Sequence, residues 1–206
     1  MPLNKLVLAS NNPGKLRELQ AMLAPLGIGV LTQSQLGIGE AEEPHPTFIE
    51  NALAKARHAS AASGLPALAD DSGLCVAALH GAPGVLSARY AEGLHTGKKN
   101  SDQLNNEKLL RDMQGVTDRR AHYYCVLALV RSANDPQPVI AEGEWHGVIA
   151  MQARGDGGFG YDPIFWLPEL GKMSAELSRD EKAQISHRAL ALKILLERLN
   201  LKLKCG

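Results

Sequence analysis

The stretch Leu65-Pro66-Ala67-Leu68-Ala69-Asp70-Asp71-Ser72-Gly73 (residues 65–73) decides the fold prediction. Its apolar half ends abruptly in two adjacent carboxylates, a hydroxyl and a glycine. This pattern predicts a buried strand that delivers acidic groups to its C-terminal end, where open α/β sheets bind their ligands. Adjacent carboxylates repel each other and are costly to bury without a cation, so the stretch suits a hard divalent metal such as Mg²⁺. A cap or turn before Gly73 is an equally good interpretation of these residues alone.

The composition of the whole chain is that of an ordinary globular protein. Its 206 residues suit a single α/β domain over residues 1–206, folded in one or two lobes. The formal net charge of zero argues against a nucleic-acid polymer or an anionic membrane as a partner, and no apolar run is long enough to span a bilayer. Cys75, Cys125 and Cys205 lie far apart, without metal-ligand or redox spacing, so we expect reduced thiols in a cytoplasmic protein.

A phosphate site is predicted near the N-terminus. Residues 5–9 suit a buried strand, and leucines at helical spacing follow the polar residues 10–15. Asn12 suits the N-cap and Pro13 the first helical position. Free backbone N–H groups and the helix dipole would then attract phosphate, and Lys15 in the first turn indicates a nearby anion. The alternative is a capped helix with a solvated lysine, and the loop lacks the spacing of a Walker A motif.

A second helix is predicted from a capping box. Thr47 is followed three residues later by Glu50, and an alanine-rich segment comes next. Asn51 and Lys55 share one face of this helix, and we expect that face to point into water rather than into a site. The acidic residues 40–43 are expected to form a solvated loop.

The segments after residue 73 are expected to extend the sheet. Residues 74–79 suit either a new strand or a buried continuation of the preceding one, and residues 103–113 suit an amphipathic helix. Residues 121–130 and 138–150 predict an antiparallel hairpin. Residues 93–100 form a polar, basic loop.

A glycine-rich loop at residues 155–163 is the second informative stretch. It contains the rings of Phe159 and Tyr161 together with the carboxylate of Asp162. Exposed rings beside adaptable backbone suit stacking on a base, and the carboxylate or the backbone suits reading a base edge. The alternative is a long hairpin loop whose rings are packed into the core.

One long helix is predicted after the capping box of Ser178 and Glu181. Its core face is expected at four apolar positions, Leu190, Ile194, Leu195 and Leu199. Three groups in its first half, Lys182, His187 and Arg188, suit a grip on phosphate or on a purine carbonyl. The alternative is an ordinary helix surface.

Together these signals describe a nucleoside triphosphate with Mg²⁺ as the ligand. The chain also carries, in order, Ser10-Asn11-Asn12-Pro13-Gly14-Lys15, Thr47-Phe48-Ile49-Glu50-Asn51-Ala52, Ala69-Asp70-Asp71-Ser72-Gly73-Leu74, Gly81-Ala82-Pro83-Gly84 with Ser87-Ala88-Arg89-Tyr90, Gly157-Gly158-Phe159-Gly160-Tyr161-Asp162-Pro163 and Ser186-His187-Arg188. In these motifs, which span nearly its whole length, it resembles the inosine/xanthosine triphosphate pyrophosphatases, the HAM1-like house-cleaning enzymes for deaminated purine nucleotides.

The resemblance implies a mixed α/β fold, HAM1/Maf-like, with an elongated curved sheet, two lobes, a central nucleotide cleft and a homodimer. It implies hydrolysis of ITP, dITP and XTP to the monophosphate and pyrophosphate. Asp71 would activate water and help to hold Mg²⁺, and Glu43 would be a second metal-binding acid, against the solvated-loop expectation above. The implied substrate-binding residues are Ser10, Asn11, Asn12, Pro13, Gly14, Lys15 and Ser72 for phosphates and sugar, and Phe159, Gly160, Tyr161, Asp162, Lys182, His187 and Arg188 for the base and remaining phosphate.

Selectivity would follow from the base edge, because hypoxanthine and xanthine carry a 6-oxo group where adenine has an amino group. A donor such as His187 or Arg188 would favour the carbonyl. Three alternatives stay open: a pyrophosphatase for another modified nucleotide, a nucleotide kinase, and a non-catalytic nucleotide-binding module. The missing Walker pattern argues against the kinase.

Overall fold

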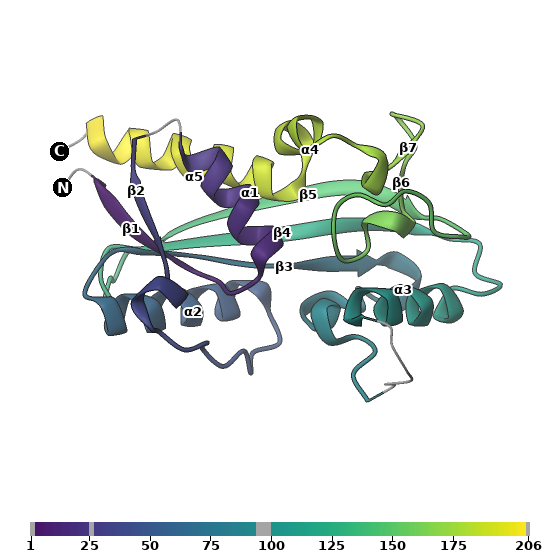
Figure 1. Ribbon diagram of the computed structural model, residues 1–206, viewed down its shortest axis with the longest axis horizontal. Coiled ribbons are helices and arrows are strands. Elements are labelled where there is room, and N and C mark those ends of the chain that lie inside the picture. Colours follow the sequence, from purple (N-terminus) through teal and green to yellow (C-terminus); the bar gives the residue numbers. More distant parts are fainter. Residues whose placement is uncertain (1–2, 25–26, 94–99, 205–206) are drawn as a thin grey trace. The chain divides into compact units, whose positions relative to one another are not determined.

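The computed structural model describes residues 3–24, 27–93 and 100–204, and the side chains as far as residue 199 (Figure 1). In this part of the chain seven strands form one mixed sheet in the order β2-β1-β3-β4-β5-β6-β7. The strands are β1 (Lys5–Ala9), β2 (Gly29–Thr32), β3 (Ala67–Val76), β4 (Arg120–Val130), β5 (Val139–Ile149), β6 (Phe165–Leu167) and β7 (Lys172–Met173). The predicted α/β class with a mixed sheet is confirmed.

Five α-helices flank this sheet in the described residues. They are α1 (Pro13–Leu23), α2 (Phe48–Ser63), α3 (Ser101–Asp112), α4 (Arg179–Ile185) and α5 (His187–Lys204). None of them is both long and apolar enough to cross a membrane. The predicted caps are present: Asn12 caps α1, and Thr47 caps α2. Most of the expected loop 93–100 and the cysteine at position 205 lie outside the described residues.

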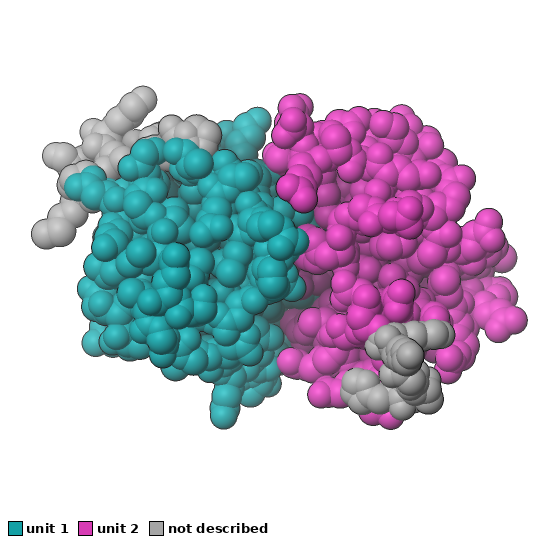
Figure 2. Space-filling view, viewed as in Figure 1, with its two compact units in different colours: residues 1–71, 125–143, 186–206 teal, residues 72–124, 144–185 magenta. Residues whose placement is uncertain are grey.

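The chain divides into two compact units (Figure 2). Unit 1 comprises residues 1–71, 125–143 and 186–206, and unit 2 comprises residues 72–124 and 144–185. Strands β3, β4 and β5 contribute residues to both units. Each unit has its own apolar core, so each is described by itself.

Unit 1 is built on parallel pairing. Strand β1 pairs in parallel with β2 and with β3, where Ala9 lies opposite Ala69. Strands in such an arrangement are covered on both faces and are therefore apolar throughout. Helices α1 and α5 cover one face of these strands and α2 covers the other (Figure 1). The contact between β5 and α5 is so close that a Cβ on Gly143 would lie 2.6 Å from the backbone nitrogen of Ala191.

Unit 2 is built around aromatic side chains. The rings of Tyr123 and Phe165 lie 4.6 Å apart between centroids, and Trp145 lies 6.2 Å from Tyr123 and 5.5 Å from Phe165, so the three rings contact one another. Leu109 of α3 and Leu74 of β3 are buried in the same cluster. Tyr161, Ile164 and Phe165 belong to this core, so it anchors the end of the glycine-rich loop.

Two predictions about element boundaries are wrong. Strand β3 does not end at the acids but continues to Val76, because Leu74 and Val76 are buried and extend the apolar face beyond them, so of the two interpretations of residues 74–79 the buried continuation applies as far as Val76. The parallel pairing with β1 does end at Ala69, so Asp70 and Asp71 follow directly after the last β1–β3 pair.

The second wrong boundary is the single C-terminal helix, which is two helices. The break falls at Ser186, whose hydroxyl accepts a hydrogen bond from the backbone N–H of Ala189 and so caps α5. Of the four predicted core positions, Leu195 is buried and Ile194 and Leu199 pack against the core of unit 1, so these are confirmed, whereas Leu190 is exposed.

Candidate active site

The loop before α1 folds as predicted but uses its donors internally. The side-chain oxygen of Asn12 accepts hydrogen bonds from the backbone N–H groups of Gly14 and Lys15, at 2.9 and 3.1 Å. The hydroxyl of Ser10 accepts one from the N–H of Asn12 at 3.2 Å. These are N–H groups that the sequence predicted to be free for phosphate, so that prediction is wrong for them. Asn11, Asn12 and Pro13 are exposed, and Gly14 is buried.

The anion predicted beside Lys15 is a carboxylate of the protein. The Lys15 ammonium lies 2.5 Å from Oδ1 of Asp70, whose side chain is fully buried. The guanidinium Nε of Arg188 donates to the other oxygen, Oδ2, at 2.8 Å. Arg188 is itself 1% exposed and also pairs with Glu18 of α1. Cys125 Sγ donates to Asp70 Oδ2 at 3.2 Å, so this thiol is reduced and structural, as predicted.

This setting fixes the protonation of Asp70. Burial by itself raises the pKa of Asp70, but the charges of Arg188 and Lys15 outweigh it and hold that pKa well below its usual range. A carboxylate of this kind stabilises the fold at any pH above its ordinary pKa of about 3.9, and the stabilisation is lost as the pH falls from there toward the folded-state pKa.

The free energy of unfolding is therefore expected to fall as the pH is lowered from about 5 to about 3, in part through Asp70. Urea unfolding at several pH values measures this dependence. In Asp70→Asn the loss over the same interval should be smaller, whereas the exposed control Asp180→Asn should follow the wild type. Equal slopes for Asp70→Asn and the wild type would remove Asp70 as a source of the pH dependence.

Asp71 belongs to a separate cluster. The ammonium of Lys55 lies 2.7 Å from Asp71 Oδ1 and 2.9 Å from Glu43 Oε1. The prediction that Lys55 points into water is wrong, and so is the solvated-loop interpretation of Glu43. Burial by itself lowers the pKa of Lys55, but Asp71 and Glu43 outweigh it and raise that pKa, so the lysine stays charged.

Asn51 explains how Glu43 reaches this cluster. It is 1% exposed, and its side chain binds both backbone groups of His45: Oδ1 accepts from the N–H at 3.1 Å and Nδ2 donates to the C=O at 3.0 Å. These two bonds attach the loop that carries Glu43 to helix α2. Asn51 and Lys55 do lie on one helix face, as their spacing predicted, but the face is turned toward the site.

The two acids on β3 do not require a shared cation. Successive side chains of a strand point to opposite faces, so Asp70 and Asp71 each meet a lysine of their own, Lys15 and Lys55. The repulsion that the sequence analysis inferred from their adjacency is thus the wrong reason for expecting a metal. The case for a metal rests instead on Asp71 and on Glu43, which shares Lys55 with it.

One oxygen of Asp71 fits a metal ligand. Oδ2 is buried and has no hydrogen-bond partner among the residues that the structure describes. Burial, with a contribution from Glu43, raises the pKa of Asp71 above its ordinary value, and Lys55 opposes this shift. Within the described ranges no three histidine, cysteine or acidic side chains are arranged to hold a metal. Mg²⁺ does not need such a set, because it binds through one or two carboxylates, water and substrate phosphates.

The glycine loop in unit 2 is organised around Asp162, which is 1% exposed. Its carboxylate accepts hydrogen bonds from four donors. They are the backbone N–H of Phe159 (2.9 Å), Ser174 Oγ (2.8 Å), Lys182 Nζ (2.5 Å) and Tyr123 Oη (3.3 Å). The predicted role of Asp162 in reading a base edge is replaced by one in holding the loop.

The two rings of the loop have different settings. Tyr161 is buried in the core of unit 2, and its hydroxyl donates to the backbone oxygen of Ser87 at 2.8 Å. The prediction of an exposed ring is wrong for Tyr161, and the core alternative applies. Phe159 is half-buried, and Lys182 Nζ lies 4.9 Å from its ring centroid. Phe159 therefore remains the ring that suits stacking.

Gly160 is held through its backbone. Its N–H donates to Asp102 Oδ2 at 2.7 Å, and its C=O accepts from Asn106 Nδ2 at 3.0 Å. Both partners lie on α3 and were missed by the sequence analysis, because a polar residue on an amphipathic helix carries no local signal of a distant backbone partner. Ser72 is half-buried at the start of unit 2.

The three cationic groups near the C-terminus are carried by two helices rather than by one. Lys182 lies on α4 in unit 2, whereas His187 and Arg188 open α5 in unit 1. His187 is 4% exposed and Lys182 is 8% exposed, so the alternative of an ordinary helix surface is wrong, whereas their contact with a ligand stays a prediction.

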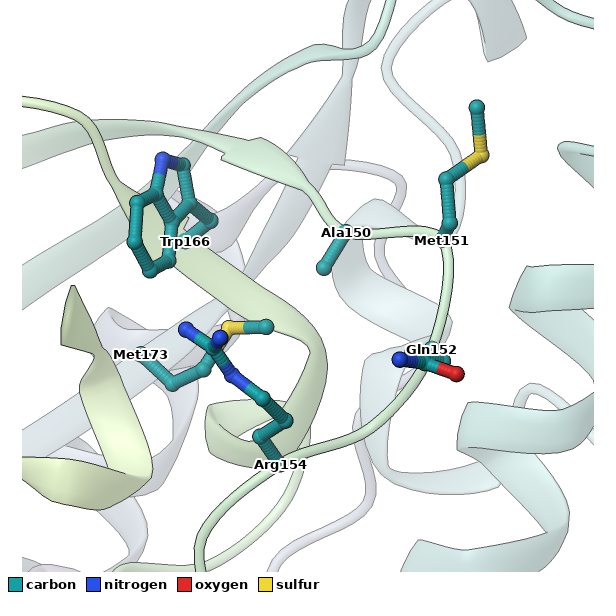
Figure 3. A pocket seen from close by; sticks show the side chains of 6 residues that line it. All are labelled: Ala150, Met151, Gln152, Arg154, Trp166 and Met173. Carbon is teal, nitrogen blue, oxygen red and sulfur yellow. The ribbon is translucent and has the colours of Figure 1, made fainter. Parts of the chain in front are cut away.

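A pocket of about 240 Å³ lies elsewhere in unit 2 (Figure 3). Its lining residues are Ala150, Met151, Gln152, Arg154, Trp166 and Met173. The guanidinium carbon of Arg154 lies 5.1 Å from the centroid of the Trp166 ring. None of the predicted site residues lines this pocket.

The site combines acidic side chains on a mixed α/β sheet with two lysines that bind them and with the capped N-terminus of a helix. These features define a class of protein that suits an anionic ligand with a bound cation. Residues 6–198 match the Ham1 family, and the chain belongs to that family. It is 64% identical to the dITP/XTP pyrophosphatase of Ralstonia nicotianae, over 97% of this chain and 98% of the relative. It is 62% identical to the dITP/XTP pyrophosphatase of Nitrosomonas europaea, over 96% and 95%.

Solved structures agree with this assignment. A HAM1 protein from Coxiella burnetii matches with a TM-score of 0.86 at 47% identity, over 95% of this chain and 98% of that one. The Ham1 protein of Staphylococcus aureus matches with a TM-score of 0.82 at 40% identity, over 96% and 99%. The family resemblance seen in the sequence motifs is thereby confirmed.

Proposed function

We propose that this protein hydrolyses deaminated purine nucleoside triphosphates, such as dITP, ITP and XTP, to the monophosphate and pyrophosphate. The observation that carries the proposal is the Glu43–Lys55–Asp71 cluster with the unpaired Oδ2 of Asp71. It occurs in a family whose similar members include dITP/XTP pyrophosphatases. The role of such an enzyme is to remove damaged nucleotides from the precursor pool.

The reaction needs a water oxygen to form a bond to the α-phosphorus while the bond from that phosphorus to the bridging oxygen of pyrophosphate breaks. Asp71 is the proposed general base, which takes the proton from the attacking water through its carboxylate. A raised pKa makes a carboxylate a better proton acceptor, and burial raises the pKa of Asp71. Lys15 and Lys55 supply fixed positive charge for the phosphate oxygens and the leaving group.

Glu43 and Asp71 are the proposed ligands of Mg²⁺, with Asp71 Oδ2 as the oxygen that is available for it. When bound, the metal neutralises phosphate charge. Ser10 to Lys15 and Ser72 are the proposed phosphate and sugar contacts. The N–H groups of Gly14 and Lys15 already donate to Asn12, so the phosphate would bind to other, exposed atoms of this loop.

Base recognition is assigned to the ring of Phe159, to the backbone of the loop at Gly160, Tyr161 and Asp162, and to Lys182, His187 and Arg188. A protein donor favours the 6-oxo group of hypoxanthine or xanthine, whereas an adenine amino group would leave that donor without an acceptor. We also propose that residues 1–206 act as one nucleotide pyrophosphatase domain, as a homodimer in the cytoplasm.

A product assay with Mg²⁺ tests the function, with dITP and dATP in parallel. We expect pyrophosphate and deoxyinosine monophosphate from dITP, with kcat/KM for dITP exceeding that for dATP by about 10²-fold or more. Chelation of the metal should stop turnover, and added Mg²⁺ should restore it. Release of single phosphate, or equal consumption of dATP, would refute the proposed reaction or its specificity.

A further inference from the structure

The buried charges around Asp70 form a continuous series from the surface of α1 to the phosphate loop. Glu18 pairs with Nη1 of Arg188, Nε of Arg188 donates to Asp70 Oδ2, and Asp70 Oδ1 pairs with Lys15 Nζ. All four residues belong to unit 1. The series joins helix α1, strand β3 and helix α5.

The exposure of these side chains shows which of them can meet a ligand. The side chains of Asp70 and Arg188 are 0% and 1% exposed, whereas those of Lys15 and Glu18 are 16% and 25% exposed. Arg188 directs two different nitrogens at two carboxylates, so its planar group is fully oriented by protein. Of the two partly exposed members, Lys15 is a cation and belongs to the predicted phosphate loop at residues 10–15, so it is the one that can meet a phosphate.

The two oxygens of Asp70 have separate tasks. Oδ2 is engaged by Arg188 and by Cys125, which leaves Oδ1 directed at Lys15. A lysine has a flexible four-carbon stem, so its ammonium needs such an anchor to keep one position. Fixed donors stabilise a transition state best when they need no reorganisation during the reaction.

We propose that Glu18 and Arg188 are positioning residues, which orient Asp70 so that it holds the Lys15 ammonium where phosphate charge develops. The inference rests on the proposed function, and it gives Arg188 a role through Asp70 and Lys15 in addition to the contact with the base proposed above. It also adds Glu18, a residue with no assigned part in the reaction. The Lys15 ammonium would interact more strongly with the transition state than with the bound substrate, so kcat should change more than KM.

The test is a double-substitution cycle on dITP hydrolysis with Mg²⁺. Glu18→Gln keeps the shape of the side chain and removes its charge, and it should lower kcat about tenfold with KM within about twofold of wild type. In a Lys15→Ala background the same substitution should have almost no further effect on kcat, because its consequence passes through Lys15. Glu18→Asp should recover part of the lost rate. Glu197→Gln on the exposed side of α5 is the matched control and should behave as wild type.

Urea unfolding of each variant separates a rate effect from a loss of fold, and Arg188→Lys is a second variant for the same series. Arg188→Lys keeps the charge but cannot direct two nitrogens at Asp70 and Glu18, so it should also lower kcat. Additive losses in Glu18→Gln and Lys15→Ala, or a Glu18→Gln rate equal to that of Glu197→Gln, would overturn the inference. If wild-type protein releases no pyrophosphate from dITP, the proposed function fails first, so the two failures are distinguishable.

Discussion

Replacing Asp71 by asparagine is expected to lower kcat for dITP hydrolysis by about 10²- to 10⁴-fold, the contribution typical of a general base. Asparagine keeps the size of the side chain but cannot accept the proton of the attacking water, and it is a weaker ligand for Mg²⁺. The fold should be retained, because Lys55 keeps its second carboxylate, Glu43, at 2.9 Å. Steady-state release of pyrophosphate at saturating Mg²⁺ measures the effect.

The matched control for Asp71→Asn is Glu42→Gln, which removes an exposed charge next to Glu43. It should leave kcat within about twofold of wild type, as surface substitutions usually do. A loss in Asp71→Asn that excess Mg²⁺ fully reverses would assign Asp71 to metal binding alone. Wild-type turnover in Asp71→Asn would show that Asp71 takes no part in the reaction.

Replacing Arg188 by methionine is expected to destabilise the protein by about 3–5 kcal/mol, the usual cost of removing one partner of a buried ion pair. Asp70 is then left buried with Lys15 as its remaining cation among the pairs described above. Since folded proteins are stable by only about 5–15 kcal/mol, a large part of the stability would be lost. Urea unfolding monitored by the two tryptophans measures the change.

Arg57→Met is the control for Arg188→Met, because Arg57 is exposed on α2 in the same unit. Its effect should be within about 0.5 kcal/mol. The double substitution Asp70→Asn with Arg188→Met should be more stable than Arg188→Met alone, since it removes the uncompensated charge. A loss of stability below about 1 kcal/mol for Arg188→Met would show that the ion pairs of Arg188 contribute little to the stability of the fold.

Local chemistry made part of this structure predictable from sequence. The caps at Asn12 and Thr47 are hydrogen bonds to residues three or fewer positions away, so both partners can be found in a short stretch of sequence. The apolar run of β1 likewise encodes a buried parallel strand. The anion beside Lys15 could be inferred because a lysine is unfavourable in the first turn of a helix.

Partners that are distant in sequence could not be predicted in the same way. Asp70 and Arg188 are 118 positions apart, and nothing in the spacing of either residue encodes the other. The same holds for the hydroxyl of Tyr161, whose acceptor at Ser87 is 74 positions away. Family resemblance predicted Glu43 as a site residue, but only the fold shows that Asn51 holds its loop in place.

Lys55 has a consequence for how the apo and holo forms of the protein are related. An ammonium between Glu43 and Asp71 balances their charge when no divalent ion is bound, so the acid pair is not a source of electrostatic strain in the empty enzyme. Proteins whose metal supplies their folding energy unfold on chelation. With Glu43 and Asp71 as the proposed metal ligands, we expect the protein to stay folded when the metal is removed, so that metal supply would govern turnover and not folding.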